Sequence, residues 1–84
     1  MEKYKNIIVY SSPDCAYCYT LKEYLKSKDV AYGEANIYDD VVEYENMKKF
    51  SGQDSVPVLF CDGKFVIGWD KEKVNELLGL WKIW

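Results

Sequence analysis

Segments with strand patterns alternate with segments of helical spacing along this sequence, and that order restricts the fold more than any other feature. β-Branched and aromatic residues at 6–10 are apolar on both faces, which is typical of a strand buried on both sides. Apolar residues then recur at helical spacing over 18–25, a short strand is expected at 30–36, and helical spacing returns over 41–50. Because strands that alternate with helices pair in parallel through right-handed crossovers, the first two strands are expected to be parallel.

A hairpin and a last helix complete this order. The strand segments 56–61 and 64–67 are separated by Asp62-Gly63, a dipeptide typical of two-residue hairpin turns, so this pair is expected to be antiparallel. Apolar residues recur at helical spacing again over 74–81. The predicted fold class is therefore α/β, with a four-stranded mixed sheet in the order β-α-β-α-β-β-α and three helices on its faces.

Composition indicates one small globular domain and excludes several functions. Residues 1–84, with 49% apolar and 30% charged side chains, suffice for one core and not for two. The net charge of −3 offers no attraction to phosphates, so no nucleic acid partner is expected. The sequence contains no histidine, which excludes a Cys-His or Ser-His catalytic pair and any His-ligated metal site.

The three cysteines do not suggest a secreted disulfide framework, which normally has a denser and even-numbered set. The apolar run at 7–10 is far too short for a signal peptide or a membrane span, so no membrane partner is expected. A cytoplasmic location is therefore predicted, in a compartment that keeps thiols reduced.

The motif Cys15-Ala16-Tyr17-Cys18 lies where the first strand is expected to pass into the first helix. Residues three apart on a helix share one face, and their Cα atoms are about 5–6 Å apart, which is within range for a disulfide. Free backbone N–H groups and the helix dipole stabilise a thiolate in the first turn, where cysteine pKa values of about 3.5–7.5 occur. Cys15 is therefore predicted to be the nucleophile, and Cys18 the thiol that displaces the product.

A metal site is the competing interpretation of these cysteines. One C-x-x-C motif supplies two ligands, whereas zinc takes four. Cys61 would be a third ligand, but it ends an apolar strand beside a turn, which favours an unreactive core thiol. No metal site is therefore predicted for this chain.

Pro57 interrupts an otherwise regular strand pattern. Proline cannot donate to a β-ladder, so it must lie at a sheet edge, at a bulge or at a special peptide bond. One interpretation is an edge strand protected against aggregation. The other is a cis peptide opposite the cysteines, which leaves the backbone of Val56 free to pair with an incoming peptide. The spacing alone leaves both interpretations open.

The chain resembles the thioredoxin superfamily over essentially its whole length, and within it the glutaredoxins and the small glutaredoxin-like redoxins. Three short segments carry this resemblance besides the cysteine motif, and they are Val9-Tyr10-Ser11, Ser55-Val56-Pro57 and Gly68-Trp69-Asp70. The resemblance implies a thioredoxin-like fold. It also implies that residues 1–84 form a single glutaredoxin-like domain and act as a dithiol thiol-disulfide oxidoreductase.

The resemblance also implies roles for individual residues. Pro57 is expected to be cis and to face Cys15, and the backbone of Val56 to bind the cysteine portion of the substrate. The segment 68–70 (Gly68, Trp69 and Asp70), with a helix N-terminus behind it, is expected to receive a carboxylate. Tyr17, within the active-site loop, is expected to be exposed and to contact substrate. For Trp69, a place in a substrate groove and a packing role remain equally open.

The implied substrates are protein disulfides or glutathione mixed disulfides, with glutathione as a co-substrate, no tightly bound cofactor and a monomeric chain. One alternative is a redoxin that takes electrons from thioredoxin reductase and supplies ribonucleotide reductase. Ser12 favours this alternative, because glutathione-using members commonly have a lysine three residues before the first cysteine. A second alternative is a non-catalytic carrier in which Cys15 helps to bridge a [2Fe–2S] cluster between two chains.

Overall fold

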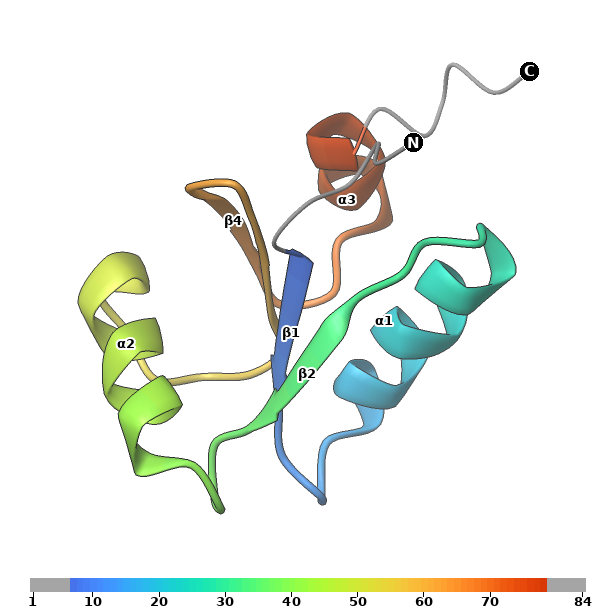
Figure 1. Ribbon diagram of the computed structural model, residues 1–84. Helices are drawn as coiled ribbons and strands as arrows, with labels where there is room; N and C mark the ends of the chain where they lie inside the picture. The colour runs from blue at the N-terminus through green and yellow to red at the C-terminus, as the bar shows by residue number, and fades with distance from the viewer. Residues whose placement is uncertain (1–6, 79–84) are drawn as a thin grey trace.

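The computed structural model describes residues 7–78 and has the predicted alternation of strands and helices (Figure 1). The elements in chain order are β1 (Ile7–Ser11), α1 (Ala16–Ser27), β2 (Gly33–Asn36), α2 (Val41–Ser51), β3 (Val58–Cys61), β4 (Lys64–Ile67) and α3 (Lys71–Leu78). The strands form one sheet in the order β2-β1-β3-β4. The β1–β2 pair is parallel, and the β1–β3 and β3–β4 pairs are antiparallel. The predicted mixed α/β sheet is confirmed.

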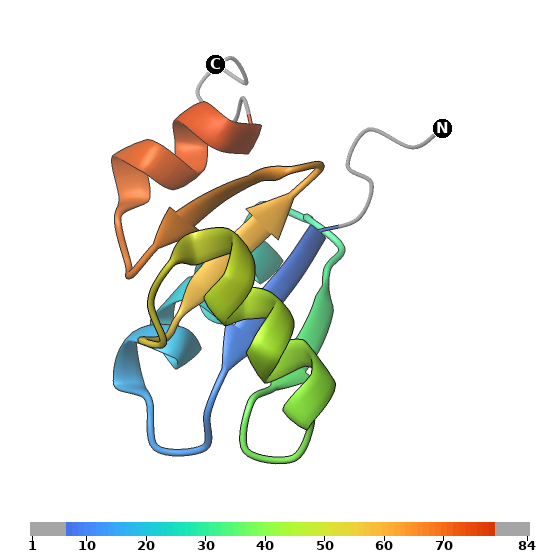
Figure 2. The ribbon, with the colours of Figure 1, turned by 90° about the vertical axis from the view of Figure 1, so that its left-hand side faces the viewer.

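Helices cover both faces of this sheet. Figure 2 shows α2 in front of the strands and α1 behind them. Side chains of α1 and α3 share one core cluster with the sheet, which consists of Ile7, Val9, Leu21, Leu25, Val30, Leu59, Cys61, Val66, Val74 and Leu78. On the α2 side, the buried cluster consists of Tyr10, Ala35, Met47 and Val58. The protein therefore has three layers, with the sheet between a two-helix layer and a one-helix layer.

Strand β1 supplies side chains to both clusters. Ile7 and Val9 point into the core shared with α1 and α3, whereas Tyr10 belongs to the α2 side. Alternate side chains of a strand face opposite sides of a sheet, so a strand with helices on both sides must be apolar on both. This explains the continuous apolar run that marked the first strand in the sequence.

Two strands begin later than the sequence predicted. β2 starts at Gly33, because the backbone N–H of Val30 bonds to the carbonyl of Leu25 (3.0 Å) and closes the end of α1. The side chain of Val30 is nevertheless buried in the core. β3 starts at Val58, directly after Pro57, which has no N–H to give to a ladder.

Turns and caps follow their local sequence signals. Asp40 caps α2, and its carboxylate accepts a hydrogen bond from the backbone N–H of Glu43 (3.1 Å). Gly52 ends α2 in the left-handed conformation (φ 74°), which glycine adopts without strain. Asp62 and Gly63 both have positive φ, 49° and 87°, as a two-residue hairpin turn that matches the strand twist requires.

The last predicted apolar stripe is only partly described. Val74 and Leu78 of α3 are buried, as its helical spacing predicted, whereas Trp81 lies outside the described residues. Within 7–78, none of the helices is long and apolar enough to cross a membrane.

Candidate active site

Cys15 and Cys18 lie at the junction between β1 and α1. Cys15 has extended backbone angles and is the N-cap of α1, one residue before the first turn where the sequence analysis placed it. The two cysteines form a disulfide, with Cα atoms 5.2 Å apart. The predicted pairing across one helical turn is therefore confirmed.

The two cysteine residues differ in exposure to solvent. Cys15 is half-buried, whereas Cys18 is only 1% exposed and lies one turn into α1. An external thiol or disulfide can therefore reach Cys15, while Cys18 is reached from within the protein. This asymmetry is what a nucleophile and a resolving thiol require.

The backbone favours negative charge on the sulfur of Cys15. The N–H of Cys18 donates a hydrogen bond to Cys15 Sγ (3.0 Å), so the sulfur occupies the position of a capping oxygen. The first turn of α1 contains no acidic residue, and Asp14 precedes the cap on the exposed surface. Free N–H groups at a helix N-terminus act as partial positive charges, which stabilise a thiolate without a neighbouring base.

The segment around Pro57 is joined to the loop before α3. The Val56–Pro57 peptide bond is cis, as the resemblance implied, and Pro57 is fully buried. The carbonyl of Pro57 accepts a hydrogen bond from the N–H of Gly68 (2.7 Å). The segments 55–57 and 68–70, which are separate in the sequence, are therefore hydrogen-bonded neighbours in the fold.

Trp69 and Asp70 have structural partners. The ring of Trp69 packs edge-on against Tyr24 of α1, with centroids 5.4 Å apart. The carboxylate of Asp70 accepts from the N–H of Lys73 (3.2 Å) and so caps α3. For Trp69, the ring contact with Tyr24 favours the packing interpretation.

Tyr17 is 65% exposed, as expected for the active-site loop.

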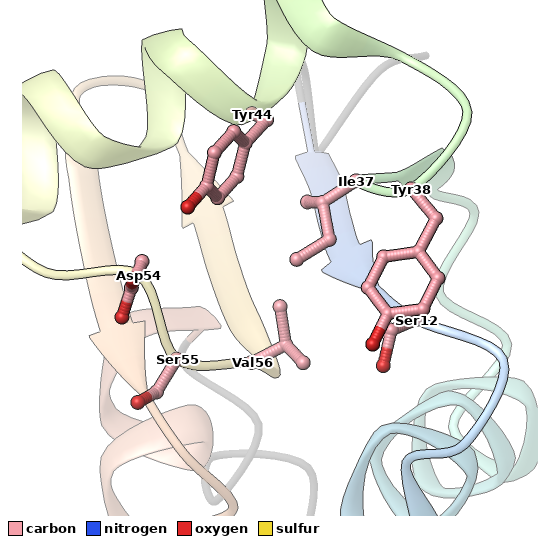
Figure 3. A pocket seen from close by; sticks show the side chains of 7 residues that line it. All are labelled: Ser12, Ile37, Tyr38, Tyr44, Asp54, Ser55 and Val56. Carbon is pink, nitrogen blue, oxygen red and sulfur yellow. The ribbon is translucent and has the colours of Figure 1, made fainter.

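A pocket of about 460 Å³ adjoins Val56 (Figure 3). Its lining comes from three separate segments and comprises Ser12, Ile37, Tyr38, Tyr44, Asp54, Ser55 and Val56. Of these, only Val56 was a predicted site residue. The missed residues follow the carboxyl ends of the parallel strands β1 and β2 or precede Pro57. The rule that α/β sheets bind ligands at the carboxyl ends of their strands could have found the first group.

Cys61 differs from Cys15 and Cys18 in lying outside the helix start and the disulfide. Its thiol is buried at the end of β3, and burial, followed by the charge of Asp62, raises its pKa. A raised pKa keeps the thiol protonated and unreactive near neutral pH. Within residues 7–78, no group of three or more cysteine, aspartate or glutamate side chains is placed to hold a metal ion.

Comparisons with known proteins agree with this geometry. The sequence profile of the family described as Glutaredoxin matches residues 7–66. A glutaredoxin-like 8.6 kDa protein in the rubredoxin operon of Clostridium pasteurianum is 40% identical over 72 residues, covering 86% of this chain and 96% of that protein. Glutaredoxin 3 of Escherichia coli K12 is 35% identical over 65 residues, covering 77% and 78% of the two chains.

The fold is also similar to that of solved structures. The crystal structure of the thioredoxin-like protein BC3987 matches with a TM-score of 0.81 at 35% identity, covering 86% of this chain and 99% of that one. This likeness confirms the thioredoxin-like fold. Together with the cysteine pair at the start of α1, the sequence matches show that the chain belongs to the glutaredoxin family, whose members are thiol-disulfide oxidoreductases.

Proposed function

We propose that the chain reduces disulfides by a two-cysteine cycle. The thiolate of Cys15 attacks one sulfur of the substrate disulfide; that S–S bond breaks, and the first substrate thiolate leaves and takes a proton. The Cys18 thiolate then attacks Cys15 Sγ, which releases the second substrate thiol. Two electrons have passed to the substrate, and the dithiol has become the Cys15–Cys18 disulfide.

The observation that carries this proposal is the difference between the two sulfurs. Cys15 is accessible and receives a backbone hydrogen bond, whereas Cys18 is buried within bonding distance of it. A substrate can therefore meet only one of the two thiols directly. The buried thiol can react only after Cys15 has formed a mixed disulfide.

The proposed substrate contacts come from Val56, the 68–70 loop and Tyr17. Val56 lies outside β3 and lines the pocket, which supports pairing of its backbone with the substrate next to Pro57. The loop of Gly68, Trp69 and Asp70 is held to Pro57 by the Gly68 hydrogen bond and is the proposed site for a substrate carboxylate. Tyr17 adds an exposed ring beside the cysteines.

The cycle needs a source of electrons but no bound cofactor. We propose protein disulfides or glutathione mixed disulfides as substrates, and a cytoplasmic location, because the dithiol must be reduced again after each turn. The reductant is glutathione or a thioredoxin-reductase-type enzyme. Coupled oxidation of NADPH, with glutathione and glutathione reductase in one assay and thioredoxin reductase in the other, identifies which donor supports turnover.

The roles of the two cysteines are tested by substituting each with serine. We expect Cys18→Ser to accumulate a mixed disulfide with a peptide substrate, because the first attack proceeds and the second cannot. We expect Cys15→Ser to form no adduct and to lose turnover. Mass spectrometry under non-reducing conditions detects the adduct, and the coupled assay measures turnover.

The matched control is Cys61→Ser, which removes a buried thiol at the end of β3. This variant is expected to keep full turnover. Retained turnover in Cys15→Ser, or an adduct on Cys18 in that variant, would reverse the assignment of the two roles.

A further inference from the structure

The pocket beside Val56 combines an apolar wall with hydroxyl groups and one carboxylate. The side chains of Ile37 and Val56 point toward each other, and Tyr44 extends from α2 with its hydroxyl toward the 54–56 segment (Figure 3). Asp54 is the one charged residue in the lining, and its side chain is exposed. The volume of about 460 Å³ is within the usual range of about 300–1,000 Å³ for ligand pockets.

The segments that form this pocket carry no positive charge. Residues 6–21, 29–47 and 50–63 contain neither lysine nor arginine. Two lysines outside these segments have partners of their own. Lys22 is bound to Glu34 (2.6 Å), and Lys48 lies over the ring of Tyr44, 5.1 Å from its centroid, without lining the pocket. The pocket is therefore unsuited to an anion.

The pocket adjoins the loop that carries the reactive cysteine. Ser12, which lines the pocket, precedes Cys15 by three residues, so the backbones of these two residues are at most about 10 Å apart. A peptide whose cysteine is bonded to Cys15 can therefore place a side chain two or three residues away into this pocket.

We propose that this pocket binds a lysine or arginine side chain of a protein substrate, close in sequence to the cysteine that Cys15 attacks. This inference rests on the proposed two-cysteine cycle and specifies its substrate class. The aliphatic stem packs against Ile37 and Val56, as the stems of long cationic side chains do on apolar surface. The charged end lies near the Asp54 carboxylate and the Tyr44 hydroxyl.

The same chemistry disfavours anionic substrates. A glutamate side chain or a glutathione carboxylate in the pocket would meet Asp54 and lose its hydration without gaining a positive partner. Glutathione disulfide is therefore expected to react more slowly than a peptide disulfide of cationic sequence.

The test compares three peptide disulfides that differ at one position. Each peptide has a cysteine and, two residues away, lysine, glutamine or glutamate. The fully reduced protein is mixed with each disulfide, and the release of peptide thiol gives a second-order rate constant at low and at high ionic strength. The lysine peptide is expected to react about two- to fivefold faster than the glutamine peptide at low salt, as for a partly exposed ion pair. The glutamate peptide is expected to be the slowest.

Substitution of Asp54 is expected to remove this order. Asp54→Asn should abolish most of the lysine preference, because the neutral side chain makes no ion pair. Asp54→Lys should make the glutamate peptide and glutathione disulfide the faster substrates.

The matched control is Asp29→Asn. It removes the same charge, but just after the C-terminal end of α1, whereas Cys15 lies at the N-terminal end of that helix. That helix has 12 residues, about 18 Å, so Asp29 is farther from Cys15 than the screening length of about 8–10 Å. Asp29→Asn is expected to keep the lysine preference. An equal loss of preference in Asp29→Asn and Asp54→Asn would show general charge attraction and overturn the pocket proposal.

The outcomes separate this proposal from the one on which it rests. If no peptide is reduced, the two-cysteine cycle is wrong. If all three peptides react at one rate, and Asp54→Asn changes none of them, the cycle stands and the cationic pocket is wrong.

Discussion

The environments of single residues set the chemistry of this protein. Cys15 and Cys18 are three residues apart, yet one caps α1 and is accessible while the other is almost completely buried. The cap position supplies a hydrogen bond from the backbone, so no second side chain is needed to activate the sulfur. This explains how a chain without histidine performs thiol chemistry.

Tyr10 is a residue whose environment affects stability at alkaline pH. Its hydroxyl donates to Glu43 (3.1 Å) in the core on the α2 side. Burial, followed by the charge of Glu43, raises the pKa of Tyr10 to about 12. The unfolded chain loses this proton near pH 10, whereas the folded protein holds it, so the contribution to stability is present below pH 10 and disappears as the pH rises toward 12.

We therefore expect the free energy of unfolding to fall between pH 10 and pH 12, with up to about 3 kcal/mol of the loss due to Tyr10. Urea unfolding at a series of pH values measures this. Tyr10→Phe should make the decline shallower, whereas Tyr19→Phe, which alters an exposed ring, should not. The same slope in Tyr10→Phe and in the unsubstituted protein would show that Tyr10 is not responsible.

At the scale of the elements, α2 has a capping residue at each end and one fully buried side chain. Met47 is its one fully buried side chain, with Tyr44 and Phe50 partly buried against the same cluster. The carboxylate of Asp40 at its start and the left-handed Gly52 at its end satisfy backbone groups that the helix leaves free.

We expect Asp40→Ala to lower the free energy of unfolding by about 0.5–2 kcal/mol, because the backbone N–H of Glu43 loses its partner. The neighbouring Asp39→Ala removes the same charge near the helix N-terminus without removing the cap, and should have a smaller effect. Urea unfolding followed by far-UV circular dichroism compares the two variants. Equal losses would mean that helix-dipole charge, rather than the hydrogen bond, is what Asp40 contributes.

At the scale of the whole molecule, the sheet joins two cores that no helix shares. β1 and β3 contribute buried residues to both, so the loss of packing on one face is transmitted through the strands to the other. A hydrogen bond between Tyr24 of α1 and Asn75 of α3 links the two helices of the other layer. The domain is therefore expected to unfold as one cooperative unit.

We expect Met47→Ala to destabilise the whole domain by about 2–5 kcal/mol, because it leaves a cavity in a core with few other buried side chains. Tryptophan fluorescence, which reports partly on Trp69 in the opposite layer, and far-UV circular dichroism should give coincident urea transitions. A transition by circular dichroism that precedes the fluorescence change would show that α2 and its face unfold separately.

Local signals in the sequence predicted most of the fold. The Asp62-Gly63 turn and the helical spacings are determined by residues close together in the chain, and the structure has both. The exact starts of β2 and β3 were predicted two or three residues too early. Strand ends depend on which backbone groups find partners, and those partners belong to other segments.

What the sequence determined by itself is the reactive pair, since three residues of helix are enough to bring Cys15 and Cys18 together. The tertiary structure alone decided what surrounds that pair. Ser12, Tyr44 and Asp54 lie in three segments separated by ten or more residues, and only the parallel pairing of β1 with β2 and the path from α2 to β3 bring them to one pocket. Chain proximity is local information, whereas the shape and charge of a pocket arise from contacts between segments that are distant in sequence.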